Sequence, residues 1–127
     1  MYRKRLYLLI IPISIIVTLS VITYLNCLPN QFVYDDSSTI VENKLIKDWG
    51  NFLTLFTHDY FKISGELTYR PIVTLSYFID YSIWHMNPVG YHLVNVILHT
   101  INVVLVYFLT LLLLRQYNKY TTQSSHN

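Results

Sequence analysis

Residues 91–114 read YHLVNVILHTINVVLVYFLTLLLL, and this apolar stretch decides the class of fold. It holds no Asp, Glu, Lys or Arg. At a rise of about 1.5 Å per residue, a helix of this length crosses a hydrocarbon core of about 30 Å. Asn87 and Pro88 stand before it, a favourable N-cap followed by a favourable first helical residue. We therefore predict a transmembrane helix over residues 91–114.

Residues 6–28 form another uncharged apolar run, which follows the basic start MYRKR. Pro12 lies in the first turns of this run, where a missing N–H costs least. A cleaved signal peptide is the alternative. The apolar region of a signal is only about 7–15 residues long and ends at small residues, which TYLNCLPN at residues 23–30 does not offer. We predict a retained transmembrane helix.

The composition agrees with an all-α membrane protein. Of the 127 residues, 53% are hydrophobic and 13% are charged, against about 25% charged residues in a soluble domain. The net charge of +2 is small, and no basic patch alternates with aromatic residues, so no nucleic-acid partner is predicted. The single cysteine, Cys27, excludes an intrachain disulfide.

The placement of the charges predicts the topology. Basic residues flank the outer ends of both apolar runs, whereas all seven acids lie between the runs. Because Lys and Arg collect on the cytoplasmic side, both termini should be cytoplasmic. The protein is then a multi-pass protein of the bacterial inner membrane or the endoplasmic reticulum. Its segments are residues 1–28 (N-terminus and first span), 29–90 (external or lumenal loop), 91–114 (second span) and 115–127 (polar, frayed tail).

Two amphipathic helices are predicted inside the loop. Apolar residues from Trp49 to Tyr60 recur at i, i+3, i+4, i+7 and i+11, with Asp48 as the N-cap. After the turn ISGEL, another helix should run from Pro71 to about Trp84. Both are expected along the membrane surface, and the alternative is that they pack on each other as a small cap. The broad apolar side of the later helix comprises Ile72, Leu75, Phe78, Ile79 and Ile83.

A polar stripe enters the second predicted span. His92, Asn95, His99 and Asn102 follow at i, i+3, i+7 and i+10, which is one face of a helix. This face should turn toward protein or a wet cavity. Two roles of this stripe remain open. Its side chains could form interhelical hydrogen bonds, which contribute about 0.6 to 2 kcal/mol per contact, or they could line a substrate cavity. The two histidines are about 10 Å apart along the axis, too far to share a zinc ion.

Charged residues in the loop offer candidate chemistry. In an extended chain Asp35 and Asp36 point to opposite sides, so they do not grip one ion and no metal site is predicted. One of them could act as a general base at a cavity mouth. The alternative is a solvated turn, because DDSST is rich in residues that bond nearby backbone. Arg70 could hold a lipid phosphate or simply reach up to water.

Three stretches together resemble a known family. They are FVYDD (residues 32–36), YRPIVTLSYFIDY (69–81) and MNPVGYHLVNVILHTIN (86–102). Their order and spacing resemble the N-terminal part of membrane glycosyltransferases with the GT-C fold. The transmembrane and tetratricopeptide-repeat protein O-mannosyltransferases and their bacterial relatives are the most similar group.

The resemblance implies a partial GT-C fold and an activity. Such enzymes transfer a sugar, here mannose, from a polyprenyl-phosphate carrier in the membrane to a protein or lipid acceptor outside or in the lumen. Asp35 is then the first candidate for the catalytic base, and Asp36 the second. No cofactor is predicted, and a divalent metal is left open. The candidate substrate-binding residues are Arg70, near the phosphate, and His92, Asn95 and His99.

The chain departs from the family after its second apolar run. Complete members carry many more membrane helices and a C-terminal region of helical repeats. We therefore expect a fragment, a split-gene product or a degraded copy, inactive alone and completed by the missing C-terminal part. The alternative function is a non-enzymatic two-span accessory protein that docks through its polar stripe.

Overall fold

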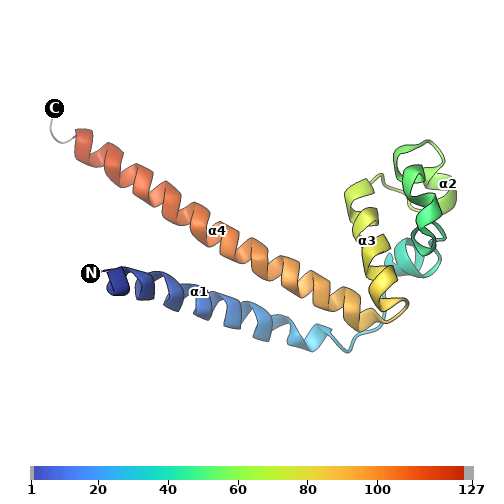
Figure 1. Cartoon of the computed structure of the whole chain (residues 1–127), viewed down its shortest axis with the longest axis horizontal. Coiled ribbons are helices and arrows are strands. Elements are labelled where there is room, and N and C mark those ends of the chain that lie inside the picture. Colours follow the sequence, from blue (N-terminus) through green and yellow to red (C-terminus); the bar gives the residue numbers. More distant parts are fainter. Residues whose placement is uncertain (1, 125–127) are drawn as a thin grey trace. The chain divides into compact units, whose positions relative to one another are not determined.

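The computed structural model describes residues 2–124, and no strand occurs among them (Figure 1). The prediction of an all-α chain is therefore confirmed for this part. The label η marks a short 3-10 or π segment. In chain order the elements are α1 (Tyr2–Tyr24), η1 (Leu25–Cys27), η2 (Ser37–Val41), η3 (Leu45–Lys47), η4 (Trp49–Phe56), α2 (Tyr60–Ser64), α3 (Pro71–Trp84) and α4 (Pro88–Ser124).

Within residues 2–124, two helices are long and apolar enough to cross a membrane. Their apolar stretches are Leu9–Cys27 and Pro88–Gln123, with mean hydropathies of 2.1 and 2.3. Hardly any of either stretch is buried, and large side chains such as Ile15 and Leu105 are more than half exposed, at 54% and 59%. Water-soluble proteins rarely expose apolar patches of this size. Both predicted spans are thus present as long apolar helices.

The ends of α4 follow local signals. Asn87 Oδ1 accepts a hydrogen bond from the Val89 N–H at 3.2 Å, which confirms the predicted N-cap before Pro88. The helix then continues to Ser124, so residues 115–124 are helical where a frayed tail was expected. This stretch contains neither glycine nor proline to stop the helix.

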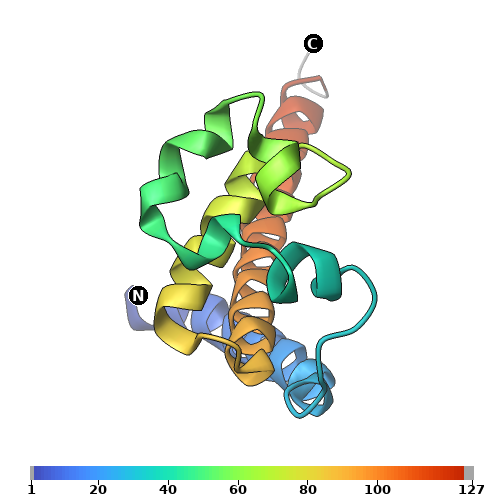
Figure 2. The ribbon, with the colours of Figure 1, turned by 90° about the vertical axis from the view of Figure 1, so that its right-hand side faces the viewer.

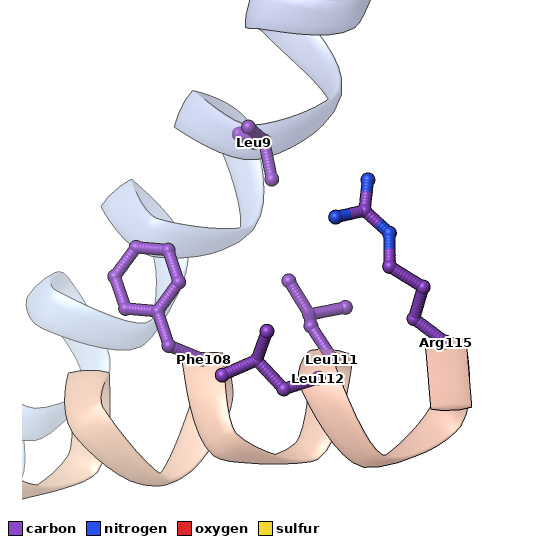
Figure 3. A pocket seen from close by; sticks show the side chains of 5 residues that line it. All are labelled: Leu9, Phe108, Leu111, Leu112 and Arg115. Carbon is purple, nitrogen blue, oxygen red and sulfur yellow. The ribbon is translucent and has the colours of Figure 1, made fainter. Parts of the chain in front are cut away.

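The chain divides into two compact units, and α4 contributes to both. One unit contains the chain up to Asn26 and from Asn95 onward. In it, Ser20 and Thr100 form a hydroxyl–hydroxyl hydrogen bond of 3.1 Å between α1 and α4. A cavity of about 380 Å³ in the same unit is almost wholly apolar (Figure 3). Its lining comprises Leu9, Phe108, Leu111, Leu112 and Arg115.

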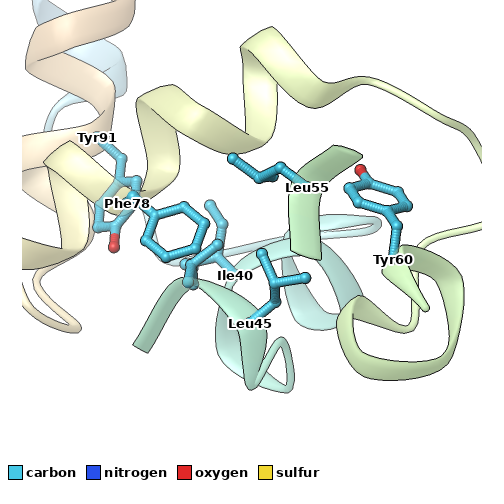
Figure 4. Packing of buried hydrophobic residues seen from close by; sticks show 7 residues of the cluster. Ile40, Leu45, Leu55, Tyr60, Phe78 and Tyr91 are labelled. Carbon is cyan, nitrogen blue, oxygen red and sulfur yellow. The ribbon is translucent and has the colours of Figure 1, made fainter. Parts of the chain in front are cut away.

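The other unit, Cys27–Val94, has a hydrophobic core of its own. Segment η3 contacts both η4 and α3, and these contact each other (Figure 2). Burying each large apolar side chain contributes about 1.5–3 kcal/mol. The two regions predicted as loop helices therefore pack together, as the cap alternative proposed. The core residues are Ile40, Leu45, Ile46, Leu55, Tyr60, Phe78 and Tyr91 (Figure 4).

The predicted helix from Trp49 to Tyr60 is wrong in type and length. Asp48 does cap it, because its Oδ1 accepts a hydrogen bond from Gly50 N–H at 2.9 Å. However, η4 is a 3-10 helix and ends at Phe56. With three residues per turn, Leu55 follows Trp49 and Phe52 on one face. Leu55 is accordingly fully buried, although the α-helical spacing had not included it.

Helix α3 has the predicted bounds, but its apolar side is split. Phe78 is fully buried, whereas Ile72, Ile79 and Ile83 are 74%, 48% and 60% exposed. Buried Thr74 lies one turn before Phe78. The helix thus turns a partly polar face to the core and leaves apolar residues outward. An outward apolar face is what a helix lying on a membrane surface requires, and that location stays a prediction.

Candidate functional site

The double aspartate lies in a tight turn before η2. Tyr34 has a φ of 52°, in the left-handed region. Across this bend, Asp36 Oδ2 accepts a hydrogen bond from the Val33 N–H at 3.0 Å. The Asp35 carboxylate is exposed and accepts no hydrogen bond within residues 2–124. The two neighbouring acids therefore differ: one holds its own turn, and the other is free.

The backbone of Asp35 is firmly held. Its carbonyl oxygen accepts hydrogen bonds from Thr39 N–H at 2.8 Å, Thr39 Oγ1 at 2.9 Å and Ser38 Oγ at 3.0 Å. Such local bonds are what the solvated-turn alternative predicted for DDSST. Because the turn is fixed, the free carboxylate is presented from a rigid base.

Arg70 meets a buried acid that sequence reasoning overlooked. Its Nη2 lies 3.6 Å from Glu66 Oε2, and the Glu66 side chain is completely buried. The Arg70 side chain is 37% exposed. Its Nε is buried without an acceptor in the described part of the chain. The guanidinium is thus anchored at one side and accessible at another, so it does not simply reach up to water.

Glu66 is the centre of a buried polar network. Its Oε1 accepts hydrogen bonds from Thr74 Oγ1 at 3.0 Å and from Asn43 Nδ2 at 3.3 Å. Its Oε2 accepts a hydrogen bond from the Tyr60 hydroxyl at 2.9 Å. A buried carboxylate is tolerated only when it is paired and hydrogen-bonded in this way. No helical spacing could have found it, because residues 65–70 lie between α2 and α3 and the i, i+4 pairing rule holds only on a helix.

Tyr77 is a partly buried tyrosine of α3 in the same unit as the acidic turn and Arg70. Burial raises the pKa of the Tyr77 hydroxyl, the Arg70 guanidinium lowers it, and the carboxylates of Asp36, Glu66 and Asp35 raise it. Burial is the largest of these causes, so the phenol keeps its proton at neutral pH.

Aromatic rings join three segments of the Cys27–Val94 unit. The Tyr77 ring lies 6.4 Å from the Tyr91 ring, measured between centroids. The Tyr91 ring meets Phe32 edge to face, at 5.3 Å and 78°. Phe32 opens the FVYDD stretch, so the rings link the start of the acidic turn to α3 and to the first turn of α4. Such pairs contribute about 0.5–1.5 kcal/mol beyond their buried area.

The polar stripe is distributed over both units. His92 Nε2 lies 3.1 Å from the carbonyl oxygen of Asn30, in the same unit as Asp35 and Arg70. His99 belongs to the other unit, where its ring packs against Tyr24 at 4.7 Å. Asn95 is exposed. Within the described residues, no group of three or more His, Cys, Asp and Glu side chains gathers to hold a metal.

Asp80 is a further buried acid on α3. It is only 6% exposed, and no hydrogen bond to its carboxylate occurs within residues 2–124. Burial raises its pKa from the ordinary value of 3.8 to about 6. The carboxylate is therefore a source of pH-dependent stability.

We expect Asp80→Asn to stabilise the Cys27–Val94 unit above pH 6 but not near pH 4. Because the folded pKa is the higher one, the unfolded chain loses this proton first as the pH rises. The native protein is then penalised progressively between about pH 4 and 6, by up to about 3 kcal/mol at higher pH. Urea unfolding of the full chain in detergent at pH 4 and pH 8, followed by tryptophan fluorescence, measures the difference. Equal stabilisation by Asp80→Asn at both pH values would contradict the raised pKa of Asp80.

Together, fold and site define a class. The described residues are helical and include two long apolar helices suited to a membrane, and the unit Cys27–Val94 holds the free Asp35 carboxylate and the Arg70 guanidinium anchored by Glu66. These features are those of a membrane protein with a polar site outside its apolar helices.

Comparison with curated proteins names the family of its relatives. A protein O-mannosyl-transferase of Caenorhabditis elegans is 34% identical over 98 residues, covering 73% of this chain and 14% of the relative. Protein O-mannosyl-transferase Tmtc1 of Drosophila melanogaster is 36% identical over 101 residues, covering 76% and 12%. Protein O-mannosyl-transferase TMTC2 of Homo sapiens is 40% identical over 88 residues, covering 60% of this chain and 10% of the relative.

The homologues of this chain are thus protein O-mannosyl-transferases of the TMTC family, which confirms the resemblance found in the sequence. The chain spans only 10–14% of the length of these three relatives. No family model matches the chain, and no solved structure matches it.

Proposed function

We propose that this chain forms part of a membrane glycosyltransferase site with a partial GT-C fold. The site would transfer a sugar, mannose by the names of the relatives, from a polyprenyl-phosphate carrier to a protein or lipid acceptor. One observation carries the proposal. The compact unit Cys27–Val94 holds both an exposed Asp35 carboxylate, free of hydrogen bonds within residues 2–124, and a partly exposed Arg70 guanidinium that is paired with buried Glu66.

In this proposal Asp35 is the general base. Its carboxylate takes the proton of the acceptor hydroxyl while that oxygen attacks the anomeric carbon of the sugar. The bond between this carbon and the phosphate oxygen breaks, and the carrier phosphate leaves with the bonding electrons. One displacement inverts the anomeric centre. Asp36, whose carboxylate is engaged by the Val33 N–H, keeps the turn in shape.

Arg70 supplies positive charge to the leaving phosphate in this proposal. Glu66 holds one nitrogen of the guanidinium, and the side chain keeps an accessible side. An ionised guanidinium forms short, strong hydrogen bonds to phosphate oxygens. A fixed donor costs little reorganisation as charge develops on the leaving group.

The topology belongs to the same proposal. Basic residues outside both apolar helices support cytoplasmic termini and an external or lumenal segment at residues 29–90. An acceptor would then approach Asp35 from the aqueous side, and the carrier would approach Arg70 from the lipid. The outward apolar residues of α3 support a position of this unit at the membrane surface.

Arg70→Gln should weaken the binding of a water-soluble, short-chain prenyl phosphate by about 10-fold or more. The reason is the loss of a charge-assisted contact to phosphate. Isothermal titration calorimetry on the full chain in neutral nanodiscs measures the affinity. Lys62→Gln is the matched control, because Lys62 is an exposed cation of the same unit that pairs with Asp59. If both variants lost affinity equally, nonspecific charge and not Arg70 would explain the binding.

A docking role is the other candidate function, and one observation favours it. Asn95 and Asn102 lie exposed on the apolar part of α4, and their side-chain amides have no hydrogen-bond partner within residues 2–124. Polar side chains facing lipid are costly, so these amides favour a further membrane helix beside α4. In a purely accessory protein, replacing both by leucine would abolish association with the partner, and Asp35 would be dispensable.

A further inference from the structure

The apolar cavity between α1 and α4 ends at a cation (Figure 3). Leu9 of α1 forms one wall, and the other lining residues belong to α4. These α4 residues share one helical face, because they follow at i, i+3, i+4 and i+7. They are Phe108, Leu111, Leu112 and Arg115. The cavity, of about 380 Å³, thus joins an apolar wall to a guanidinium.

Arg115 has no acidic side chain to pair with in its own unit. It is exposed and forms no hydrogen bond or ion pair with any side chain that the structure describes. All seven acids of the chain lie in Cys27–Val94, outside this unit. Lys119, also exposed, follows Arg115 by one turn of α4, and the basic residues 3–5 precede Leu9 by one to two turns of α1. The chain itself therefore leaves the positive charge at this end of the unit uncompensated.

The lining of this cavity restricts what fills it. Its volume is within the range of about 300–1,000 Å³ that is typical of small-ligand sites, and its apolar wall favours an apolar occupant over water. A guanidinium forms short, strong hydrogen bonds with phosphate oxygens. A free phosphate leaves the apolar wall uncovered, and an uncharged lipid leaves Arg115 unpaired. An amphiphile with an apolar chain and a phosphate meets both conditions.

The position along α4 favours a membrane phospholipid over the prenyl-phosphate carrier. Arg115 lies about 20 residues after Asn95, or about 30 Å along the helix axis, which is the thickness of a hydrocarbon core. By the topology proposed above, this end of α4 is at the cytoplasmic leaflet, whereas the carrier reaches Arg70 from the external or lumenal side. Cytoplasmic leaflets carry the anionic phospholipids that attract basic segments beside a membrane helix.

We propose that this cavity binds one anionic phospholipid. An acyl chain of the lipid lies against Leu9, Phe108 and Leu112, and its phosphate accepts hydrogen bonds from Arg115. Lys119 supplies a further positive charge to the headgroup. The choice of leaflet rests on the proposed topology, but the site does not depend on the proposed sugar transfer.

Native mass spectrometry of the full chain, released from a neutral detergent, measures the binding of single lipids. The ligands are phosphatidylglycerol, phosphatidylcholine with the same acyl chains, and a short-chain prenyl phosphate. The parent chain should bind phosphatidylglycerol about 5-fold or more tightly than phosphatidylcholine. Arg115→Gln should remove most of this preference and leave phosphatidylcholine binding unchanged. Lys44→Gln is the matched control, because Lys44 is an exposed cation of the other unit without an ion pair among the described residues.

Leu9→Trp tests the cavity apart from the charge, because it fills the apolar space and retains Arg115. It should weaken the binding of phosphatidylglycerol at least as much as Arg115→Gln does. Leu105→Trp is its control, since Leu105 is an exposed apolar residue of α4 that does not line this cavity. This control should bind the lipid as the parent chain does.

Three results would overturn the proposal. Equal affinity of the parent chain for both phospholipids would show an ordinary lipid contact. Equal losses in Arg115→Gln and Lys44→Gln, or no loss in Leu9→Trp, would show nonspecific charge attraction in place of a site. Tighter, Arg115-dependent binding of the prenyl phosphate would assign the cavity to the carrier and not to a phospholipid.

Discussion

Glu66→Ala is expected to lower the free energy of unfolding of the Cys27–Val94 unit by about 3 kcal/mol. The substitution leaves the Tyr60 hydroxyl, the Thr74 hydroxyl and the Asn43 amide without their shared acceptor. It also removes the partner of Arg70. Each donor keeps another acceptor, since Asn43 Nδ2 also bonds the Thr39 carbonyl, the Tyr60 hydroxyl lies 2.7 Å from Thr74 Oγ1, and Thr74 Oγ1 also bonds the Arg70 carbonyl. The main loss is therefore the ion pair, and breaking a buried ion pair costs about 3–5 kcal/mol. Because the Arg70 side chain is 37% exposed, the expected loss of unfolding free energy lies near the lower end of this range.

Tryptophan fluorescence makes this measurement specific to one unit. The sequence has two tryptophans, and both Trp49 and Trp84 lie in Cys27–Val94. Urea unfolding of the full chain in detergent gives the free energy for each variant. Glu42→Ala is the matched control, since Glu42 is an exposed acid of the same unit and should change stability by less than about 0.5 kcal/mol. Equal values for the two variants would show that the network contributes nothing.

Elements with strong local signals could be predicted from the sequence. Pro71 at the first turn set the start of α3, and Asn87 with Pro88 set the start of α4. Asp48 was predicted to be an N-cap from its position before the apolar run, and its side chain does accept a hydrogen bond from the backbone N–H two residues on. In each case the deciding interaction lies within a few residues along the chain, where spacing and residue type determine it.

Features that depend on distant partners could not be predicted. The Glu66 network joins Asn43, Tyr60 and Thr74, and no short-range pattern reports that these side chains meet. The role of Leu55 depends on the 3-10 winding of η4, which an assumed α-helical period hides. The free state of the Asp35 carboxylate follows from the left-handed bend at Tyr34, and an extended reading of FVYDD does not contain that bend.

Asp35→Asn is expected to lower the rate of sugar transfer by at least about 100-fold. An amide has nearly the shape of the carboxylate but cannot take the acceptor proton, and general base catalysis typically contributes 10²–10⁴-fold. The carboxylate makes no hydrogen bond in the described part of the chain, so the fold should be unaffected. The substitution is made at the aligned position of a reconstituted full-length TMTC relative. The rate of mannose transfer is then measured from labelled prenyl-phosphate mannose to a hydroxyl acceptor.

The most direct test of the central claim is to compare Asp35→Asn with Asp36→Asn in that transfer assay. Asparagine at position 36 can still accept the Val33 N–H bond that holds the turn, but it cannot act as a base. We expect transfer within about 5-fold of the parent for Asp36→Asn and a loss of at least about 100-fold for Asp35→Asn. Normal transfer by the Asp35→Asn variant, in correctly inserted protein, would contradict the claim that this carboxylate is the base.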